Sequence, residues 1–97
     1  MKYLVVTKRR ASVQAVADVM RTTKEYVNGE LSSGRADCVY LFASGDGSGM
    51  GIANADSPEQ LVETLLKHPE YQNFEWDIRP LCDFNRITDK MLEALQK

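Results

Sequence analysis

The sequence has little of what metal, nucleic-acid or membrane binding requires. It contains one histidine and two cysteines, Cys38 and Cys82, which lack the spacing of zinc ligands, so we expect no metal site. A net charge of -2 offers no basic excess for a phosphate backbone, so nucleic acid is not an expected partner. No apolar run is long enough for a signal peptide or a membrane span. We therefore expect a cytoplasmic protein with reduced, inert thiols.

The length of 97 residues corresponds to a single domain spanning residues 1–97. A domain of this size builds only a modest core, and part of its apolar surface is often buried by a partner subunit. The composition of 43% hydrophobic and 27% charged residues is ordinary for a globular chain. We therefore expect a homodimer or a higher homo-oligomer.

Local patterns predict an order of β-α-β-β-α-β followed by a C-terminal helix. Alternation predicts strands at residues 2–8, 38–43, 50–53 and 74–79, and helical spacing predicts helices at 12–34, 57–68 and 88–95. Ser12 is the expected N-cap of the first helix and Gly34 its terminator. A capping box with proline at Ser57-Pro58-Glu59-Gln60 begins the second helix, and His68-Pro69 ends it. We expect Pro80 to limit the last strand.

This order predicts a ferredoxin-like α+β fold, with a four-stranded antiparallel sheet and both helices on one face. The other face is then bare. In the last strand, Phe74, Trp76 and Ile78 should face the helices, leaving Glu75, Asp77 and Arg79 on the bare face. An even-numbered hairpin loop around Asp46-Gly47 would add further residues to that face. They are Tyr40, Phe42, Gly49, Gly51, Ala53 and Ala55. The first strand adds either Tyr3, Val5 and Thr7 or Leu4 and Val6, and we favour the first set because Leu4 and Val6 are aliphatic and suited to helix packing.

The stretch His68-Pro69-Glu70-Tyr71 and the run from Phe74 to Cys82, within this element order, resemble the dimeric α+β barrel superfamily. The chain is most similar to muconolactone isomerase-like proteins. The resemblance implies two facing sheets in a homodimer, with a small-molecule pocket between sheet and helices or within the barrel. It also implies no cofactor, since members include cofactor-free isomerases, aromatic polyketide cyclases and monooxygenases that use neither metal nor flavin. Other members have no known activity.

We therefore expect a cofactor-independent isomerase or cyclase that acts by proton transfer on a small oxygenated or aromatic metabolite. Glu75 or Asp77 would be the base, and His68, the only histidine, would assist it or lie at the pocket rim. Arg79 would steady an enolate or bind a carboxylate. The expected substrate-binding residues are Arg79, Tyr40, Phe42, Tyr3 and Gly51.

Two other functions fit the same residues. The charged row can form ion pairs that only hold a non-catalytic binding or accessory barrel together, and a cofactor-free monooxygenase would need a buried polar pocket. The glycine-rich segment 45–51 joins two predicted strands, so it is a hairpin rather than a phosphate-binding loop. Lys8-Arg9-Arg10 is predicted as a solvated loop, with attraction of an acidic substrate as the alternative.

Overall fold

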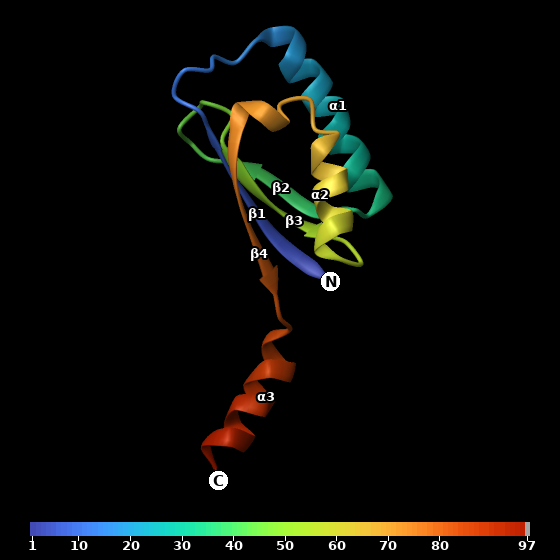
Figure 1. Cartoon of the computed structure of the whole chain (residues 1–97), viewed down its shortest axis with the longest axis vertical. Helices are drawn as coiled ribbons and strands as arrows, with labels where there is room; N and C mark the ends of the chain where they lie inside the picture. Colours follow the sequence, from blue (N-terminus) through green and yellow to red (C-terminus); the bar gives the residue numbers. More distant parts are fainter. Residues whose placement is uncertain (97) are drawn as a thin grey trace.

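The structure, a computed structural model, describes residues 1–96 and confirms the ferredoxin-like α+β fold (Figure 1). Its antiparallel sheet has the strand order β2-β3-β1-β4. The strands are β1 (Lys2–Arg9), β2 (Ala36–Leu41), β3 (Gly49–Asn54) and β4 (Phe74–Leu81). The helices are α1 (Ala17–Ser33), α2 (Pro58–Leu66) and α3 (Phe84–Leu95), with a short 3-10 helix at Tyr71–Asn73. Helices α1 and α2 cover one face of the sheet (Figure 1). No helix within residues 1–96 is long and apolar enough to cross a membrane.

Two of the predicted helix ends are confirmed. The Ser57 hydroxyl accepts a hydrogen bond from the Gln60 backbone N–H at 3.1 Å, which caps α2 next to Pro58. Gly34 closes α1 in the left-handed conformation, with φ of 80°, which glycine adopts without steric cost.

The predicted starts of α1 and α3 were wrong. Helix α1 begins at Ala17, preceded by Val16 in extended conformation and without a side-chain cap. Ser12, the predicted N-cap, therefore lies outside the helix with residues 13–16. Helix α3 begins at Phe84, where the Asp83 carboxylate accepts from the Arg86 backbone N–H at 2.9 Å. A side-chain cap of this kind satisfies one of the unpaired N–H groups of the first turn, so the helix starts earlier than its apolar spacing indicated.

The hairpin register differs from the prediction, and this exchanges the two faces of β3. Leu41 pairs with Gly49, so the connecting segment 42–48 has an odd number of residues. Met50 and Ile52 therefore lie on the open face, and Gly51 lies on the helix face opposite Val39. The close approach of β2 requires glycine there, because a Cβ on Gly51 would lie 2.9 Å from the Cys38 carbonyl oxygen. The prediction of an even loop was wrong.

The prediction for β1 was also wrong, because Tyr3, Val5 and Thr7 face the helices. Val5 pairs with Gly51 on one side and with Ile78 on the other, and directly opposed residues share a face. Tyr3 is only 2% exposed and belongs to the core with Leu61. Both faces of β1 are apolar, so hydrophobicity did not identify the one that meets the helices.

The face of β4 is as predicted. Trp76 packs against the core under the helices, and its indole N–H donates to the Tyr71 carbonyl at 2.9 Å. Pro80 does not end β4, because β4 is an edge strand and a residue without an N–H is tolerated there. The open face of the sheet has an aliphatic centre made of Leu4, Val6, Met50 and Ile52.

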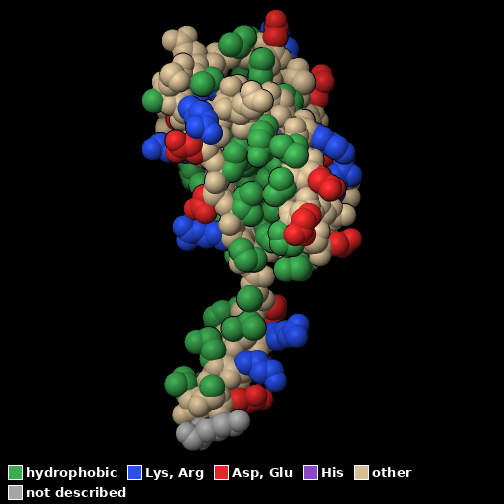
Figure 2. All heavy atoms as spheres, in the orientation of Figure 1, with side chains coloured by type: hydrophobic (Ala, Val, Ile, Leu, Met, Phe, Trp, Pro, Cys, Tyr) green, Lys and Arg blue, Asp and Glu red, His purple; other side chains and the backbone are tan. Residues whose placement is uncertain are grey.

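Helix α3 projects from the body of the molecule (Figure 1). The radius of gyration of 16.1 Å exceeds the roughly 13 Å typical of a compact chain of this length. Apolar side chains lie along one side of α3 and charged ones along the other (Figure 2). The apolar stripe is exposed at Phe84, Ile87, Met91, Leu92 and Leu95.

Candidate active site

A cavity of about 600 Å³ lies between the helices and the sheet. Its floor is formed by β2 and β3, where the small residues Gly49, Gly51 and Ala53 leave space above the sheet. Its roof is α1, which contributes Met20, Thr23, Val27 and Leu31. The walls are therefore mostly aliphatic, and the observed hairpin register creates the space by turning the small side chains of β3 toward the helices.

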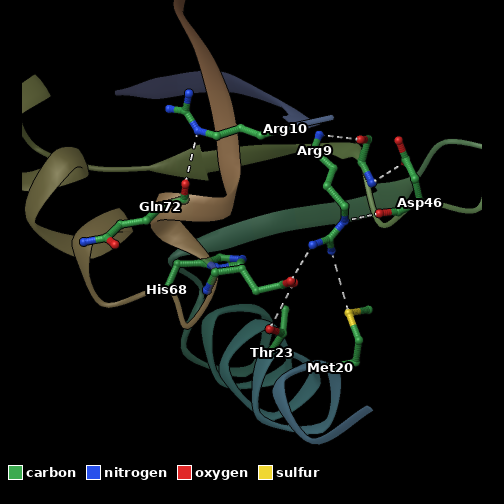
Figure 3. A network of polar contacts seen from close by, with 9 residues as sticks. Arg9, Arg10, Met20, Thr23, Asp46, His68 and Gln72 are labelled. Atoms are coloured by element: carbon green, nitrogen blue, oxygen red, sulfur yellow. Dashed lines mark hydrogen bonds and ion pairs between the residues drawn. The ribbon is translucent and has the colours of Figure 1, made fainter. Parts of the chain in front are cut away.

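A buried ion pair borders this cavity through Glu70, and Figure 3 shows its contacts. The Arg9 Nη1 atom is 2.8 Å from the Glu70 Oε1 atom, and the two side chains are 4% and 2% exposed. The Thr23 hydroxyl donates to the other carboxylate oxygen at 3.4 Å. The prediction that Arg9 belongs to a solvated loop was wrong, because its position at the end of β1 turns it under the helices. A charge pair this deeply buried requires close partners to offset its loss of hydration.

Arg9 also connects the hairpin loop to α1. Its Nε–H donates to the Asp46 carbonyl oxygen, its guanidinium lies 4.8 Å from the Phe74 ring centroid, and its Nη2 atom is 4.0 Å from the Met20 sulfur. Its Nη1 atom is close to Glu70 but lacks an aligned hydrogen bond, so that contact is electrostatic. Arg9 therefore holds the loop, the roof and the acidic group in one arrangement.

His68 lies beside this pair on the cavity wall. Its Nδ1 atom accepts a hydrogen bond from the Glu70 backbone N–H at 3.0 Å. The ring is enclosed edge-on by Tyr26, Phe74 and Trp76, with centroids 5.1, 5.9 and 5.4 Å away. Burial lowers the pKa of His68, and the negative charge of Glu70 opposes that shift. The imidazole is therefore neutral at pH 7.

Tyr26 completes the polar end of the cavity from α1. Its hydroxyl donates to the Thr64 carbonyl oxygen of α2 at 2.7 Å. Burial, and then the charge of Glu30, raise the pKa of Tyr26 to about 12. The phenol therefore stays protonated near neutrality, when it can orient a ligand but not remove a proton.

Only part of this cluster was predicted from the sequence. His68 was among the predicted site residues, whereas Arg9, Glu70, Thr23 and Tyr26 were not. Glu70 belongs to the segment that carried the family resemblance, and Tyr26 stands three residues after Thr23, a spacing that places both on one face of a helix. The pairing of Arg9 with Glu70 had no local signal.

The predicted catalytic row lies elsewhere, on the open face of the sheet. Glu75, Asp77 and Arg79 are exposed there, and a small hollow of about 320 Å³ borders Glu75 and Asp77. Arg79 donates two hydrogen bonds to Asp77, at 3.0 and 3.3 Å, and they raise the pKa of Arg79. The structure thus separates His68 from the carboxylates that were predicted to work with it.

The predicted substrate-binding residues are distributed over both faces. Gly51 and Tyr40 are among the residues that line the cavity, although Tyr40 is 66% exposed. Tyr3 is in the core, and Phe42 is 45% exposed and does not line the cavity. Among residues 1–96, no group of three histidine, cysteine or acidic side chains lies close enough to hold a metal ion.

Comparison with known proteins supports the fold through solved structures alone. No protein-family model matches the chain, and no curated protein matches it. Muconolactone isomerase matches with a TM-score of 0.68 and 17% identity, over 86% of this chain and 90% of that one. The chain has the muconolactone isomerase fold. The predicted resemblance is therefore confirmed at the level of fold.

A second solved structure has the same fold. The 5-chloro-2-hydroxyhydroquinone dehydrochlorinase of Burkholderia phenoliruptrix, in complex with 2,5-dihydroxybenzoquinone, matches with a TM-score of 0.59 and 13% identity. The match covers 89% of this chain and 98% of that one. One fold thus carries two different enzyme chemistries, so the reaction of this chain must be argued from its own residues.

Proposed function

We propose that this chain is a cofactor-independent enzyme of the isomerase or cyclase type, acting on a small oxygenated or aromatic metabolite in the cavity between sheet and helices. The observation that carries the proposal is a polar cluster on an aliphatic cavity, in which Glu70, His68 and Tyr26 line the cavity and the buried Arg9 pairs with Glu70. Ligand sites typically combine apolar walls with a few convergent polar groups, and about 600 Å³ lies within their usual range.

Glu70 is the proposed base. Its carboxylate borders the cavity, is 2% exposed and is held on both oxygens, by Arg9 and by Thr23. It would take a proton from a carbon next to a substrate carbonyl and return it to another carbon, which moves a double bond without any cofactor. Arg9 balances the charge of the carboxylate, and Tyr26 and His68 orient the substrate.

The open face of the sheet supports a homodimer. An aliphatic centre flanked by polar side chains is typical of an interface core with its rim, and a solvated sheet face would be polar throughout. Two facing sheets would place the row of Glu75, Asp77 and Arg79 beside a shared interior. The exposed apolar stripe of α3 offers a further contact with the partner, since an isolated helix of this length is marginal in water.

The second candidate function is a non-catalytic binding or accessory barrel. The double hydrogen bond between Arg79 and Asp77 favours it, because a carboxylate engaged in this way has a structural use. In that case the open-face row only stabilises the dimer.

Exchange of carbon-bound hydrogen tests the first candidate. The full chain in D₂O, incubated with cyclic unsaturated ketones and lactones, should introduce deuterium next to the carbonyl, as followed by NMR. Glu70→Gln should abolish the exchange, and Glu75→Gln should leave it unchanged. Loss of exchange in Glu75→Gln alone would place the base on the open face of the sheet. If neither the wild type nor any variant exchanges hydrogen, the result would favour the non-catalytic barrel.

Ligand entry can be measured separately. Trp76 is the only tryptophan and borders the cavity, so 2,5-dihydroxybenzoquinone bound there should quench its fluorescence in a saturable way. Val27→Phe fills part of the cavity from α1 and should weaken binding, whereas the open-face variant Asp77→Asn should not. Equal quenching in all three proteins would place the quinone outside the cavity.

A further inference from the structure

The hydrogen bond between Glu70 and His68 has a fixed direction. A backbone N–H can only donate, so the Nδ1 atom of His68, 3.0 Å away, must present its lone pair. A proton on Nδ1 would set two donors against each other and leave the Glu70 N–H unpaired. The neutral ring therefore carries its proton on Nε2.

The same contact prevents His68 from acting as a base. Nε2 already holds the proton in the neutral ring, and the imidazolium would require a second proton on Nδ1. Burial opposes that charged form as well and outweighs the opposite effect of the Glu70 charge on the pKa of His68. The other titratable group packed on the ring is Tyr26, which stays an uncharged phenol.

The side chain that carries this proton is held in place at the cavity. Tyr26 from α1 and Phe74 and Trp76 from β4 fix its plane, and the ring borders the cavity. Nε2 makes no hydrogen bond to any group within residues 1–96, and it is not among the fully buried unsatisfied atoms of that range. A polar atom left unpaired in the protein but not sealed within it can bind a ligand atom.

We propose that His68 is a neutral hydrogen-bond donor, whose Nε2–H binds a carbonyl or enolate oxygen of the ligand and never accepts its proton. This rests on the proposed function of the cavity and specifies it. Glu70 takes the proton from carbon, and the electron pair of that C–H bond moves onto the oxygen held by His68. Preorganised donors stabilise such developing charge more than they stabilise the uncharged carbonyl. A ligand group that can only donate, such as an ammonium, would be rejected there.

Nitrogen-15 NMR of the full wild-type chain tests the tautomer directly. The chain has one histidine, so the ring signals need no assignment by mutation. We expect a protonated Nε2 and an unprotonated Nδ1 at pH 7, and a shift of the Nε2 proton signal when 2,5-dihydroxybenzoquinone is added. A protonated Nδ1 in the free protein would overturn the inference even if the cavity binds ligands.

Two variants at one position test the role in binding. The side-chain amide of His68→Gln can still donate, whereas His68→Leu keeps a similar volume without a donor. We expect His68→Leu to bind the quinone about tenfold more weakly than wild type, and His68→Gln to recover most of that loss. Equal affinity in all three folded proteins would refute the donor role. If none of the three proteins binds the quinone but the ligand-free wild type carries its proton on Nε2, the proposed function is wrong and the tautomer assignment holds.

Discussion

The buried pair of Arg9 and Glu70 makes a prediction about stability. Glu70→Gln keeps the shape of the side chain and removes its charge, which leaves a guanidinium that is 4% exposed without a counter-charge. Two unit charges about 4 Å apart attract by roughly 4 kcal/mol at an effective dielectric constant of about 20. Breaking one partner of a buried pair typically costs about 3–5 kcal/mol.

The surroundings of Arg9 decide where in that range the loss should fall. The Asp46 carbonyl and the Phe74 ring still contact the guanidinium in the variant, so we expect about 3 kcal/mol. Domains of this kind are stabilised by only about 5–15 kcal/mol in total, so the shift in the denaturation midpoint should be large.

Urea denaturation of the full chain, followed by Trp76 fluorescence and by circular dichroism, measures this loss. Asp77→Asn breaks an exposed pair and is the matched control, which should barely change the midpoint. The double variant Arg9→Met with Glu70→Met should recover much of the stability, because no buried charge remains. A loss below about 1 kcal/mol in Glu70→Gln would refute the claim that the pair is buried and coupled.

Three further predictions concern pH, a hydrogen bond and the interface. Burial lowers the pKa of His68 in the folded state, so below about pH 6.5 the folded protein binds fewer protons than the unfolded chain. The free energy of unfolding should therefore be full above about pH 6.5 and decrease as the pH falls toward the folded-state pKa of His68. Unfolding measured between pH 5 and 8 should show this slope, and His68→Gln should flatten it. Tyr26→Phe removes the hydrogen bond to the Thr64 carbonyl and should lower the free energy of unfolding by about 0.5–1.5 kcal/mol. An unchanged free energy of unfolding would show that this hydrogen bond does not stabilise the fold. Ile52→Asp on the open face should convert a homodimer to monomers in analytical ultracentrifugation, whereas Leu66→Asp on α2 should not, and the opposite result would place the interface on the helices.

Local sequence signals correctly predicted the order of the elements and which residues of β4 face the helices. The capping box at Ser57, the glycine terminator at Gly34 and the alternation from Phe74 to Arg79 each act over a few residues, so one segment contains all the information they need. Antiparallel order and the placement of both helices on one face followed from the element order.

The hairpin register was decided by tertiary structure. Both faces of β1 and β3 are apolar enough to be buried, so hydrophobic sorting favoured the wrong face for each strand. The observed register depends on the backbone of β2 approaching Gly51 too closely for a side chain. Such a contact forms only between assembled strands.

The candidate site was determined by the same kind of long-range contact. The sequence by itself provided His68 and the small residues of β3, and the fold alone brought Arg9 from the end of β1 to Glu70 in the connection before β4. An arginine within a run of basic residues is normally solvated, and no local pattern distinguishes an arginine that will be buried. The sequence thus determined which elements form, whereas the packing of distant segments decided which charges lose their water and must therefore pair.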